Sequence, residues 1–293
     1  MTSKTIKRIK LVAIVILLVI AGISIGIVIE SSISERQSME KRQQLEELYN
    51  SSSGQQSVSA ESSSSTGTGY AHPQFEELIK INPDLVGWLE VGELSTPVVQ
   101  REDNEYYLKH DFYGKEDPHG TVFADTRNDL TQIEDNIVLY GHNYNKSKQI
   151  FYEVERYKNI EYVTKHPIIS FTTLHEKRDY LVFGVFVSNT EPSQGEVFDY
   201  HNRLRFKTVK EMEEFIGQVR TRSMISSNIE VTADDQLITL STCGYEFSGQ
   251  RIVLMARRLR DDETAETLRT TQYSINPKPL MPEVWMNLYG KKQ

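Results

Sequence analysis

The stretch QLITLSTCGYEFSGQRIVLMARR, residues 236–258, decides the fold because two short apolar runs flank a polar loop within it. The first run ends just before Cys243, and the second begins directly after Arg251. Runs of this length around a loop that contains glycine predict two neighbouring β-strands, Gln236–Ser241 and Arg251–Arg258. The thiol would then lie at the mouth of one strand, and the guanidinium at the start of the next.

Cys243 is the only cysteine in the 293-residue chain. A thiolate is the reactive form of cysteine, and a nearby guanidinium favours it. A lone cysteine is also typical of an ordinary buried core position, in which case Arg251 would be a surface charge. The rest of the chain decides between these two interpretations.

Short strands predominate on the N-terminal side of this stretch. Alternating and apolar runs predict further strands at Val86–Val91, Pro97–Gln100, Thr121–Ala124, Asn136–Tyr140, Pro167–Thr172 and Asp179–Ser188. Helical periodicity and capping residues predict helices or helical turns at Pro73–Ile81, Asp103–His110, Ser147–Tyr157 and Thr208–Val219. The predicted fold class is therefore mostly β with inserted helices, as a β-barrel or a sandwich.

The N-terminal region predicts a membrane anchor. Leu11–Ile29 is a run of nineteen uncharged and mostly apolar residues, which is long enough to span a bilayer. Basic residues precede the run and Glu30 follows it, which favours a cytoplasmic segment at residues 1–10 and a chain that continues outside the membrane. A cleaved signal peptide is the alternative. Its apolar region is usually shorter, about 7–15 residues, and ends at a small-residue cleavage site that this sequence does not show.

Composition divides the remainder into three parts. Residues 30–69 are polar and end in a Ser/Gly-rich run, which predicts a flexible linker. Residues 70–260 hold the predicted strands and form the folded domain, and residues 261–293 form a tail to which the sequence assigns no role. The net charge is −8 although four basic residues lie in the first ten, so the body of the chain is acidic. An acidic body argues against nucleic-acid binding as the main activity.

A second candidate residue, His142, supports a reactive thiol. Outside the membrane paired cysteines form disulfides, so an unpaired Cys243 is a candidate reactive group. A nucleophilic thiol also needs a partner that handles protons. Of the seven histidines, only His142 follows directly on a buried apolar strand, and Gly141 permits a sharp turn that would aim the imidazole into a cleft. A strand-end histidine with a local hydrogen bond is the ordinary alternative.

These motifs together resemble a sortase. TLSTC at residues 239–243, the downstream Arg251 and YGHN at residues 140–143 occur in the sortase order. The resemblance extends through most of Phe75–Leu259, and the stretches INPDLVGWLEV, PVVQREDNEYYLKHDFYG and GTVFADTRN are similar to class B sortases in particular. Sortases are membrane-anchored cysteine transpeptidases of Gram-positive bacteria. The resemblance therefore implies an eight-stranded β-barrel, a single-pass location in the cell membrane and an extracellular catalytic domain.

The resemblance also implies roles for six residues. Three are catalytic: Cys243 as the nucleophile, His142 as the general acid and base, and Arg251 as the group that stabilises the substrate or the oxyanion. Three line the groove for the sorting signal: Asn104, Leu108 and Ser241. Ordinary structural alternatives remain for the last three, namely a helix cap, a core leucine and a serine that bonds only its own strand.

The implied reaction cleaves the C-terminal sorting signal of surface proteins through a thioester on Cys243. The new carboxyl end is then joined to an amine of the cell wall peptidoglycan, with no cofactor and no metal. The sequence leaves the sorting motif open between NPxTN-like and LPxTG-like signals. Three alternatives also stay open: a class B-like pilin polymerase that uses a pilin lysine as the acceptor, a secreted cysteine protease, and a catalytically idle binding module on a membrane stalk.

Two weaker candidate sites complete the survey. Asp117, His119 and Asp125 lie close together in the sequence, but their spacing matches no metal-ligand pattern, so a solvated loop is predicted there. Glu246 lies between the thiol and Arg251, and it is predicted to be a loop charge.

Overall fold

The computed structural model describes residues 3–53, 72–132, 134–263 and 265–290. The chain divides into two compact units, Met1–Gln44 and Leu45–Gln293. Helix α1 (Ser3–Ser53) makes up the described part of the first unit and continues into the second. Most of the Ser/Gly-rich run of the predicted linker, from residue 54 onward, lies outside the described residues.

The predicted anchor, Leu11–Ile29, is helical throughout as part of α1. Its described large apolar side chains, between Ile14 and Ile29, are 53–67 % exposed. In the described part of the chain, α1 is the one helix that is long and apolar enough to cross a membrane. By length and composition it is therefore a candidate membrane span.

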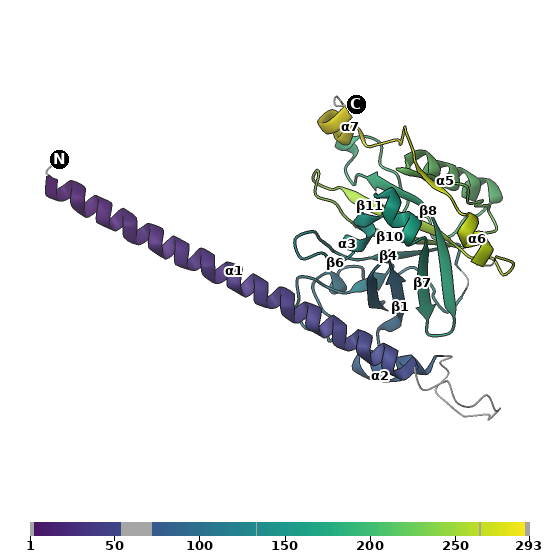
Figure 1. Ribbon diagram of the computed structural model, residues 1–293, viewed down its shortest axis with the longest axis horizontal. Coiled ribbons are helices and arrows are strands. Elements are labelled where there is room, and N and C mark those ends of the chain that lie inside the picture. Colours follow the sequence, from purple (N-terminus) through teal and green to yellow (C-terminus); the bar gives the residue numbers. More distant parts are fainter. Residues whose placement is uncertain (1–2, 54–71, 133, 264, 291–293) are drawn as a thin grey trace. The chain divides into compact units, whose positions relative to one another are not determined.

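Eight strands of the second unit close into a barrel (Figure 1). In barrel order they are β1 (Leu85–Val91), β2 (Leu94–Val99), β3 (Val122–Ala124), β4 (Asn136–Tyr140), β10 (Leu237–Cys243), β11 (Arg251–Arg258), β8 (Lys177–Ser188) and β7 (Ile168–Thr173). Neighbours are antiparallel except in the pairs β2–β3 and β4–β10, which are parallel. The predicted eight-stranded barrel is confirmed, and its closure leaves no free strand edge.

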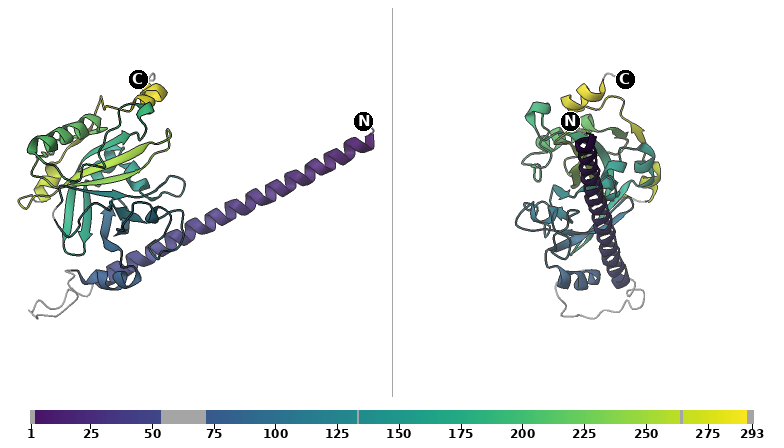
Figure 2. Two further views of the ribbon diagram at one scale, coloured as in Figure 1. Left: turned by 180° about the vertical axis from the view of Figure 1, so that it is seen from behind. Right: turned by 90° about the vertical axis from the view of Figure 1, so that its left-hand side faces the viewer.

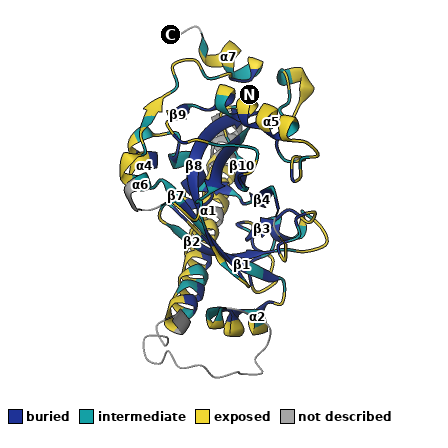
Figure 3. Ribbon diagram, turned by 90° about the vertical axis from the view of Figure 1, so that its right-hand side faces the viewer, coloured by how far each residue is buried: buried dark blue, intermediate teal, exposed yellow. Residues whose placement is uncertain are grey.

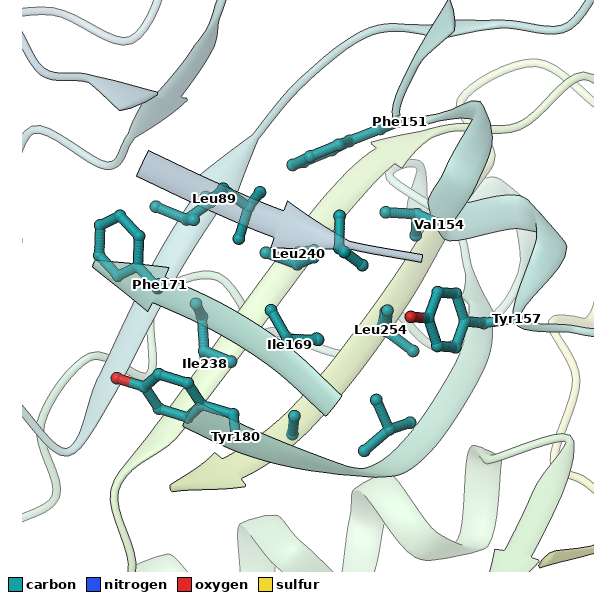
Figure 4. Packing of buried hydrophobic residues seen from close by; sticks show 14 of the residues in the cluster. Leu89, Phe151, Val154, Tyr157, Ile169, Phe171, Tyr180, Ile238, Leu240 and Leu254 are labelled. Atoms are coloured by element: carbon teal, nitrogen blue, oxygen red, sulfur yellow. The ribbon is translucent and has the colours of Figure 1, made fainter. Parts of the chain in front are cut away.

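The barrel interior is filled by alternate side chains of its strands, as the two-residue period of a strand requires. Ile238 and Leu240 of β10 and Leu254 of β11 belong to this interior cluster (Figure 4). They share it with Leu89 of β1 and Phe171 of β7, and all five side chains are fully buried. One face of the stretch that decides the fold therefore forms the centre of the barrel.

The other face of that stretch is covered by helix α5 (Val209–Arg222), which lies against the outside of the barrel (Figures 1 and 2). Thr208 caps the helix by accepting a hydrogen bond from the backbone N–H of Glu211, as its capping-box spacing predicts. The apolar face of the helix comprises Met212, Phe215, Ile216 and Val219. This face packs in one cluster with Val253 and Met255 of β11. Both faces of these strands are thus buried (Figure 3), which explains their nearly continuous apolar runs.

A third cluster shows that the compact unit begins before the predicted boundary at Tyr70. The ring of Tyr49 stacks on Trp88 with a centroid separation of 4.2 Å and an interplanar angle of 5°. Gln74 Nε2 donates a hydrogen bond of 3.1 Å to the Tyr49 hydroxyl, and Leu45 is buried in the same cluster. The last turns of α1 therefore pack on the domain, because they carry apolar and aromatic side chains that the barrel covers.

The predicted helix Ser147–Tyr157 is wrong in its first half. Strand β6 (Gln149–Ile150) pairs there with β5 (Asn143–Tyr144), and only then does helix α3 (Tyr152–Arg156) begin. Ile150 has a φ of 54°, a left-handed conformation that a right-handed helix excludes, and its side chain is buried in the barrel cluster. Tertiary packing of this side chain overrides the local helical pattern.

The other differences concern short elements. Strand β2 begins at Leu94, three residues before the predicted extended piece Pro97–Gln100. The short helices outside the tail are η2 (Pro73–Phe75), α2 (Glu76–Ile81), η3 (Tyr106–Leu108), α4 (Ile160–Lys165) and η4 (Pro192–Gln194).

The described part of the tail, residues 261–263 and 265–290, belongs to the same compact unit. After helix α6 (Ala265–Thr270), strand β12 (Tyr273–Ile275) pairs with β9 (Ile225–Ser227), and helix α7 (Glu283–Tyr289) follows. The pattern of the sequence did not predict β9 or β12, because three residues are too few to show a period.

Candidate active site

Strand register brings the thiol, the imidazole and the guanidinium to one level of the barrel. The parallel pair β4–β10 places Ser241 opposite Tyr140, so two further residues along each strand lead to Cys243 and His142. The antiparallel pair β10–β11 places Cys243 directly opposite Arg251. His142, which is distant in the sequence, thus comes to the same end of the barrel as Cys243 and Arg251, on three neighbouring strands.

All six residues proposed from the sequence line one cavity of about 290 Å³. Cys243, His142 and Arg251 form one part of its wall. The groove residues form another: Asn104, Leu108 and Ser241. Each side chain is buried or half-buried, so the cavity presents polar groups in a setting partly withdrawn from water.

His142 is held by its Nε2 atom, which donates a hydrogen bond of 2.8 Å to the backbone carbonyl of Leu108. A carbonyl can only accept, so this contact places a proton on Nε2. The preceding Gly141 has no positive φ, so its glycine is not needed for a sharp turn. A Cβ atom there would lie 2.9 Å from Cδ2 of Phe151, so glycine is needed for close packing instead. Thr242 Oγ1 donates to the Gly141 carbonyl at 2.6 Å and fixes this peptide further.

Cys243 carries a free thiol and is half-buried at the end of β10. Asn143 Nδ2 donates to the Cys243 carbonyl at 3.1 Å and to Glu155 Oε2 at 2.7 Å. Tyr245 lies in the loop that follows Cys243, and its hydroxyl donates a hydrogen bond to the Asn143 carbonyl. Burial raises the pKa of Tyr245, and the nearby charges of the Cys243 thiolate and Glu155 raise it further. This phenol therefore stays a neutral hydrogen-bond donor at ordinary pH.

Arg251 enters the cavity with most of its donors uncommitted. Its Nη1 atom donates to the Gln250 carbonyl at 3.0 Å. Within the described residues, this is the one hydrogen bond that the Arg251 guanidinium makes, and no carboxylate lies within ion-pair distance of it. A planar group with several free N–H donors is suited to bind carbonyl oxygen or a developing oxyanion.

The groove residues have contacts that the sequence did not predict. Ser241 Oγ shares a hydrogen bond of 2.7 Å with the hydroxyl of Tyr200, so Ser241 bonds beyond its own strand. Asn104 Oδ1 accepts from the backbone N–H of Thr126 at 2.9 Å and joins two loops, and it does not cap a helical turn. Leu108 is half-buried at the cavity wall, and its carbonyl is the acceptor for His142.

Sequence reasoning missed three residues of the cavity wall, namely Thr190, Tyr200 and His201. His201 does not follow a buried apolar strand in the sequence, yet it lines the same cavity as His142. Tyr200 is buried, which raises the pKa of its hydroxyl to about 12, with a smaller opposing effect from the hydrogen bond with Ser241. No local pattern marks these residues, because Thr190 lies in the short segment between β8 and η4, and Tyr200 and His201 lie in the irregular segment after η4.

The three residues considered for a metal make other contacts. His119 Nδ1 lies 2.8 Å from Asp117 Oδ1, and both side chains are buried, so this is not the solvated loop that was predicted. Asp125 pairs with Arg127 at 2.7 Å, and although burial opposes it, this guanidinium keeps the pKa of Asp125 below its usual value. Glu246, predicted to be a loop charge, accepts hydrogen bonds within its loop and from the tail.

A closed barrel with a thiol, an imidazole and a guanidinium around one cavity is the arrangement of a cysteine transpeptidase. The sortase domain family model matches residues 90–259. Sortase B of Staphylococcus aureus is 33% identical over 195 residues, which cover 65% of this chain and 77% of that protein. Sortase B of Listeria monocytogenes is 29% identical over 180 residues, which cover 61% of this chain and 70% of that protein.

Solved structures agree with these similarities. A Staphylococcus aureus sortase B–substrate complex superimposes with a TM-score of 0.67 at 28% identity, over 78% of this chain and 100% of the other. The chain therefore belongs to the sortase family, and it is a sortase-type cysteine transpeptidase. Within that family, its relatives are the class B sortases.

Proposed function

We propose that this transpeptidase cleaves the C-terminal sorting signal of surface proteins and joins the new carboxyl end to an amine of the peptidoglycan. The observation that carries the proposal is the register that places Cys243 opposite Arg251 and beside His142 at one cavity. The similarity to a Staphylococcus aureus sortase B that was solved in complex with substrate supports a substrate-binding role for this part of the fold.

In the first half of the reaction, the Cys243 thiolate attacks the carbonyl carbon before the scissile bond. A carbon–sulfur bond forms, and Arg251 donates hydrogen bonds to the oxygen as it becomes negative. Protonated His142 gives its proton to the leaving amine as the carbon–nitrogen bond breaks. The Nε2 proton is held by the Leu108 carbonyl, so Nδ1 carries the proton that is transferred. The product is a thioester.

In the second half, an acceptor amine attacks the thioester. His142 takes a proton from the amine, the carbon–sulfur bond breaks, and the thiolate returns. Asn104, Leu108 and Ser241 line the adjoining wall, where the residues of the sorting signal before the scissile bond would bind. No step requires a redox group.

The test is to mix the protein with NPxTN-like and LPxTG-like signal peptides, each with and without an added amine. Intact-mass measurement should detect an acyl-enzyme on the wild-type protein, and it should detect none on Cys243→Ala. Added glycine or lysine amines should capture the thioester faster than water does. If the products are hydrolytic only, even with saturating amine, a protease replaces this proposal. If only a pilin lysine serves as acceptor, the enzyme is a pilin polymerase.

We also propose that Leu11–Ile29 anchors the enzyme in the cell membrane, with residues 1–10 in the cytoplasm and the catalytic domain outside. The apolar run and its basic leading flank support this orientation. Residues 30–44 would then separate the membrane from the compact unit that begins at Leu45. In intact cells, protease added outside should degrade the catalytic domain, while a tag before residue 10 should be protected. A protein that is released without residues 1–29 would contradict the anchor.

A further inference from the structure

The C-terminal segment reaches the loop that joins the two strands of the site. After β12, the backbone N–H groups of Asn276 and Leu280 donate hydrogen bonds of 2.9 Å to backbone carbonyls next to the end of α5. Helix α7 then places Trp285 beside the loop Gly244–Gln250, where its indole Nε1 donates to Glu246 Oε2 at 2.9 Å. The C-terminal segment is thus hydrogen-bonded near the end of α5 and again, through Trp285, to the Gly244–Gln250 loop.

Glu246 links this contact to the guanidinium of the site. Its Oε2 atom also accepts from Gln250 Nε2 at 2.9 Å, and its backbone N–H donates to Gln250 Oε1 at 2.8 Å. Gln250 is 1% exposed, and its carbonyl accepts from both Gly244 N at 3.1 Å and Arg251 Nη1 at 3.0 Å. One chain of hydrogen bonds therefore runs from the Trp285 indole to the Arg251 guanidinium.

A second contact of α7 supports the same loop from its other side. Glu283 packs on Gly195, where a Cβ atom would lie 3.0 Å from the Glu283 backbone nitrogen. The segment that ends at Gly195 is hydrogen-bonded to the Gly244–Gln250 loop. Thr190 Oγ1 donates to the Gly249 carbonyl at 3.1 Å. Gln194 Nε2 adds a hydrogen bond of 2.6 Å to the loop backbone at position 248. Helix α7 thus contacts the Gly244–Gln250 loop directly and also contacts the segment that binds this loop.

We propose that residues 273–289 form a strap that fixes the Gly244–Gln250 loop, with Trp285 as its positioning residue. Trp285 does not line the cavity, so it acts on the reaction only through the placement of Cys243 and Arg251. This inference rests on the proposed function, in which those two residues carry the chemistry. Because the groove residues Asn104 and Leu108 lie on other segments, loosening the loop should lower kcat and leave KM nearly unchanged.

The test compares Trp285→Phe with Leu288→Ala in the full chain. Phenylalanine keeps one aromatic ring and removes the indole N–H donor together with the second ring. Leu288, which is 52% exposed on the same helix, serves as the control. In Trp285→Phe, hydrogen exchange of the Gly244–Gln250 amides should accelerate about three- to tenfold, the effect of losing one net hydrogen bond. Turnover of a signal peptide should fall by a similar factor at constant KM, and Leu288→Ala should change neither quantity.

A double variant identifies the bond itself. Glu246→Ala removes the acceptor of the same hydrogen bond, so adding Trp285→Phe to it should slow turnover little further. Additive losses, or loop exchange in Trp285→Phe equal to that in Leu288→Ala, would overturn the strap. Faster loop exchange with unchanged kcat would overturn the positioning role. If Cys243→Ala still forms product, the proposed function fails, and the exchange measurement still decides whether the strap exists.

Discussion

At the residue scale, Arg251 is suited to its proposed role because most of its N–H donors are not used by other described residues. Its position opposite Cys243 is set by strand pairing, and Nη1 is held by the Gln250 carbonyl. The rest of its planar fork faces the cavity. The spacing of such a fork matches two acceptor sites at once, whereas an ammonium is a compact point charge.

Arg251→Lys should therefore lose most of the activity although it keeps the positive charge. A donor that stabilises a transition state is worth about 3 kcal/mol, so kcat should fall by about two to three decades. Signal-peptide turnover measures this loss. Arg258→Lys is the control, because Arg258 lies at the far end of the same strand and pairs with Glu176. Near wild-type turnover in Arg251→Lys would make Arg251 a structural residue.

Tyr200 predicts a loss of stability at alkaline pH. Burial raises the pKa of its hydroxyl to about 12, whereas in the unfolded chain it ionises near pH 10. The contribution to the free energy of unfolding is therefore fully present below pH 10 and is lost as the pH rises from 10 to 12. Two pKa units correspond to on the order of 3 kcal/mol for this residue. Urea unfolding of wild type and Tyr200→Phe across this range should give a shallower decline for the variant, and parallel curves would contradict the prediction.

Among the secondary-structure elements, the end of β4 depends on a close contact with the segment that follows β6. Gly141 lies where a Cβ atom would meet the ring of Phe151, and His142 follows immediately. The segment from β5 to α3 therefore packs tightly against the end of β4. A change in that contact moves the imidazole directly.

Gly141→Ala should destabilise the protein by about 1–3 kcal/mol and should also reduce turnover, because either Phe151 or the His142 backbone must move. Gly217→Ala is the matched control. Gly217 lies in the interior of α5 with nothing within 4 Å of a built Cβ atom, so alanine should stabilise the helix by roughly 0.5–1 kcal/mol. Thermal unfolding with parallel activity assays distinguishes the two. Unchanged turnover in Gly141→Ala would mean that the contact does not orient His142.

On the scale of the whole molecule, the catalytic unit includes more of the chain than the matched family model. That model covers residues 90–259, whereas the compact unit extends from Leu45 to Gln293. At one end, Tyr49 and Leu45 close a cluster around Trp88. At the other, β12 and α7 pack on the barrel and its loops. Both additions contribute buried surface and hydrogen bonds, so both should contribute to stability.

Tyr49→Ala should lower the free energy of unfolding by about 3 kcal/mol, because it removes a ring that is 7% exposed and stacked on Trp88. A protein that begins at Tyr70 should unfold at a lower urea concentration than one that begins at Leu45. Tyr113→Ala is the control, since its ring is 38% exposed and should contribute much less. Equal unfolding midpoints for the two starting points would place the domain boundary at Tyr70 after all.

The sequence by itself determined most of the longer elements and the candidate catalytic residues. The paired runs at residues 236–258, the amphipathic helix at Thr208–Val219 and the apolar run Leu11–Ile29 are visible because burial on one face imposes a local period or an unbroken apolar length. The candidate catalytic residues are visible for a different reason. A lone thiol, and a histidine that follows a buried strand, stand out from their local surroundings.

Only the tertiary structure decided which residues complete the site and how far the domain extends. The partnership of Ser241 with Tyr200, the contact between Trp285 and Glu246, and the stack that includes Tyr49 join residues 39 to 41 positions apart. Likewise, the left-handed backbone conformation of Ile150 is incompatible with the helix that the local pattern predicts there. These features depend on strand register and on which side chains fill the remaining space. Strand register and side-chain packing are set by the burial of apolar surface over the whole barrel, so they cannot be predicted from any single stretch of the sequence.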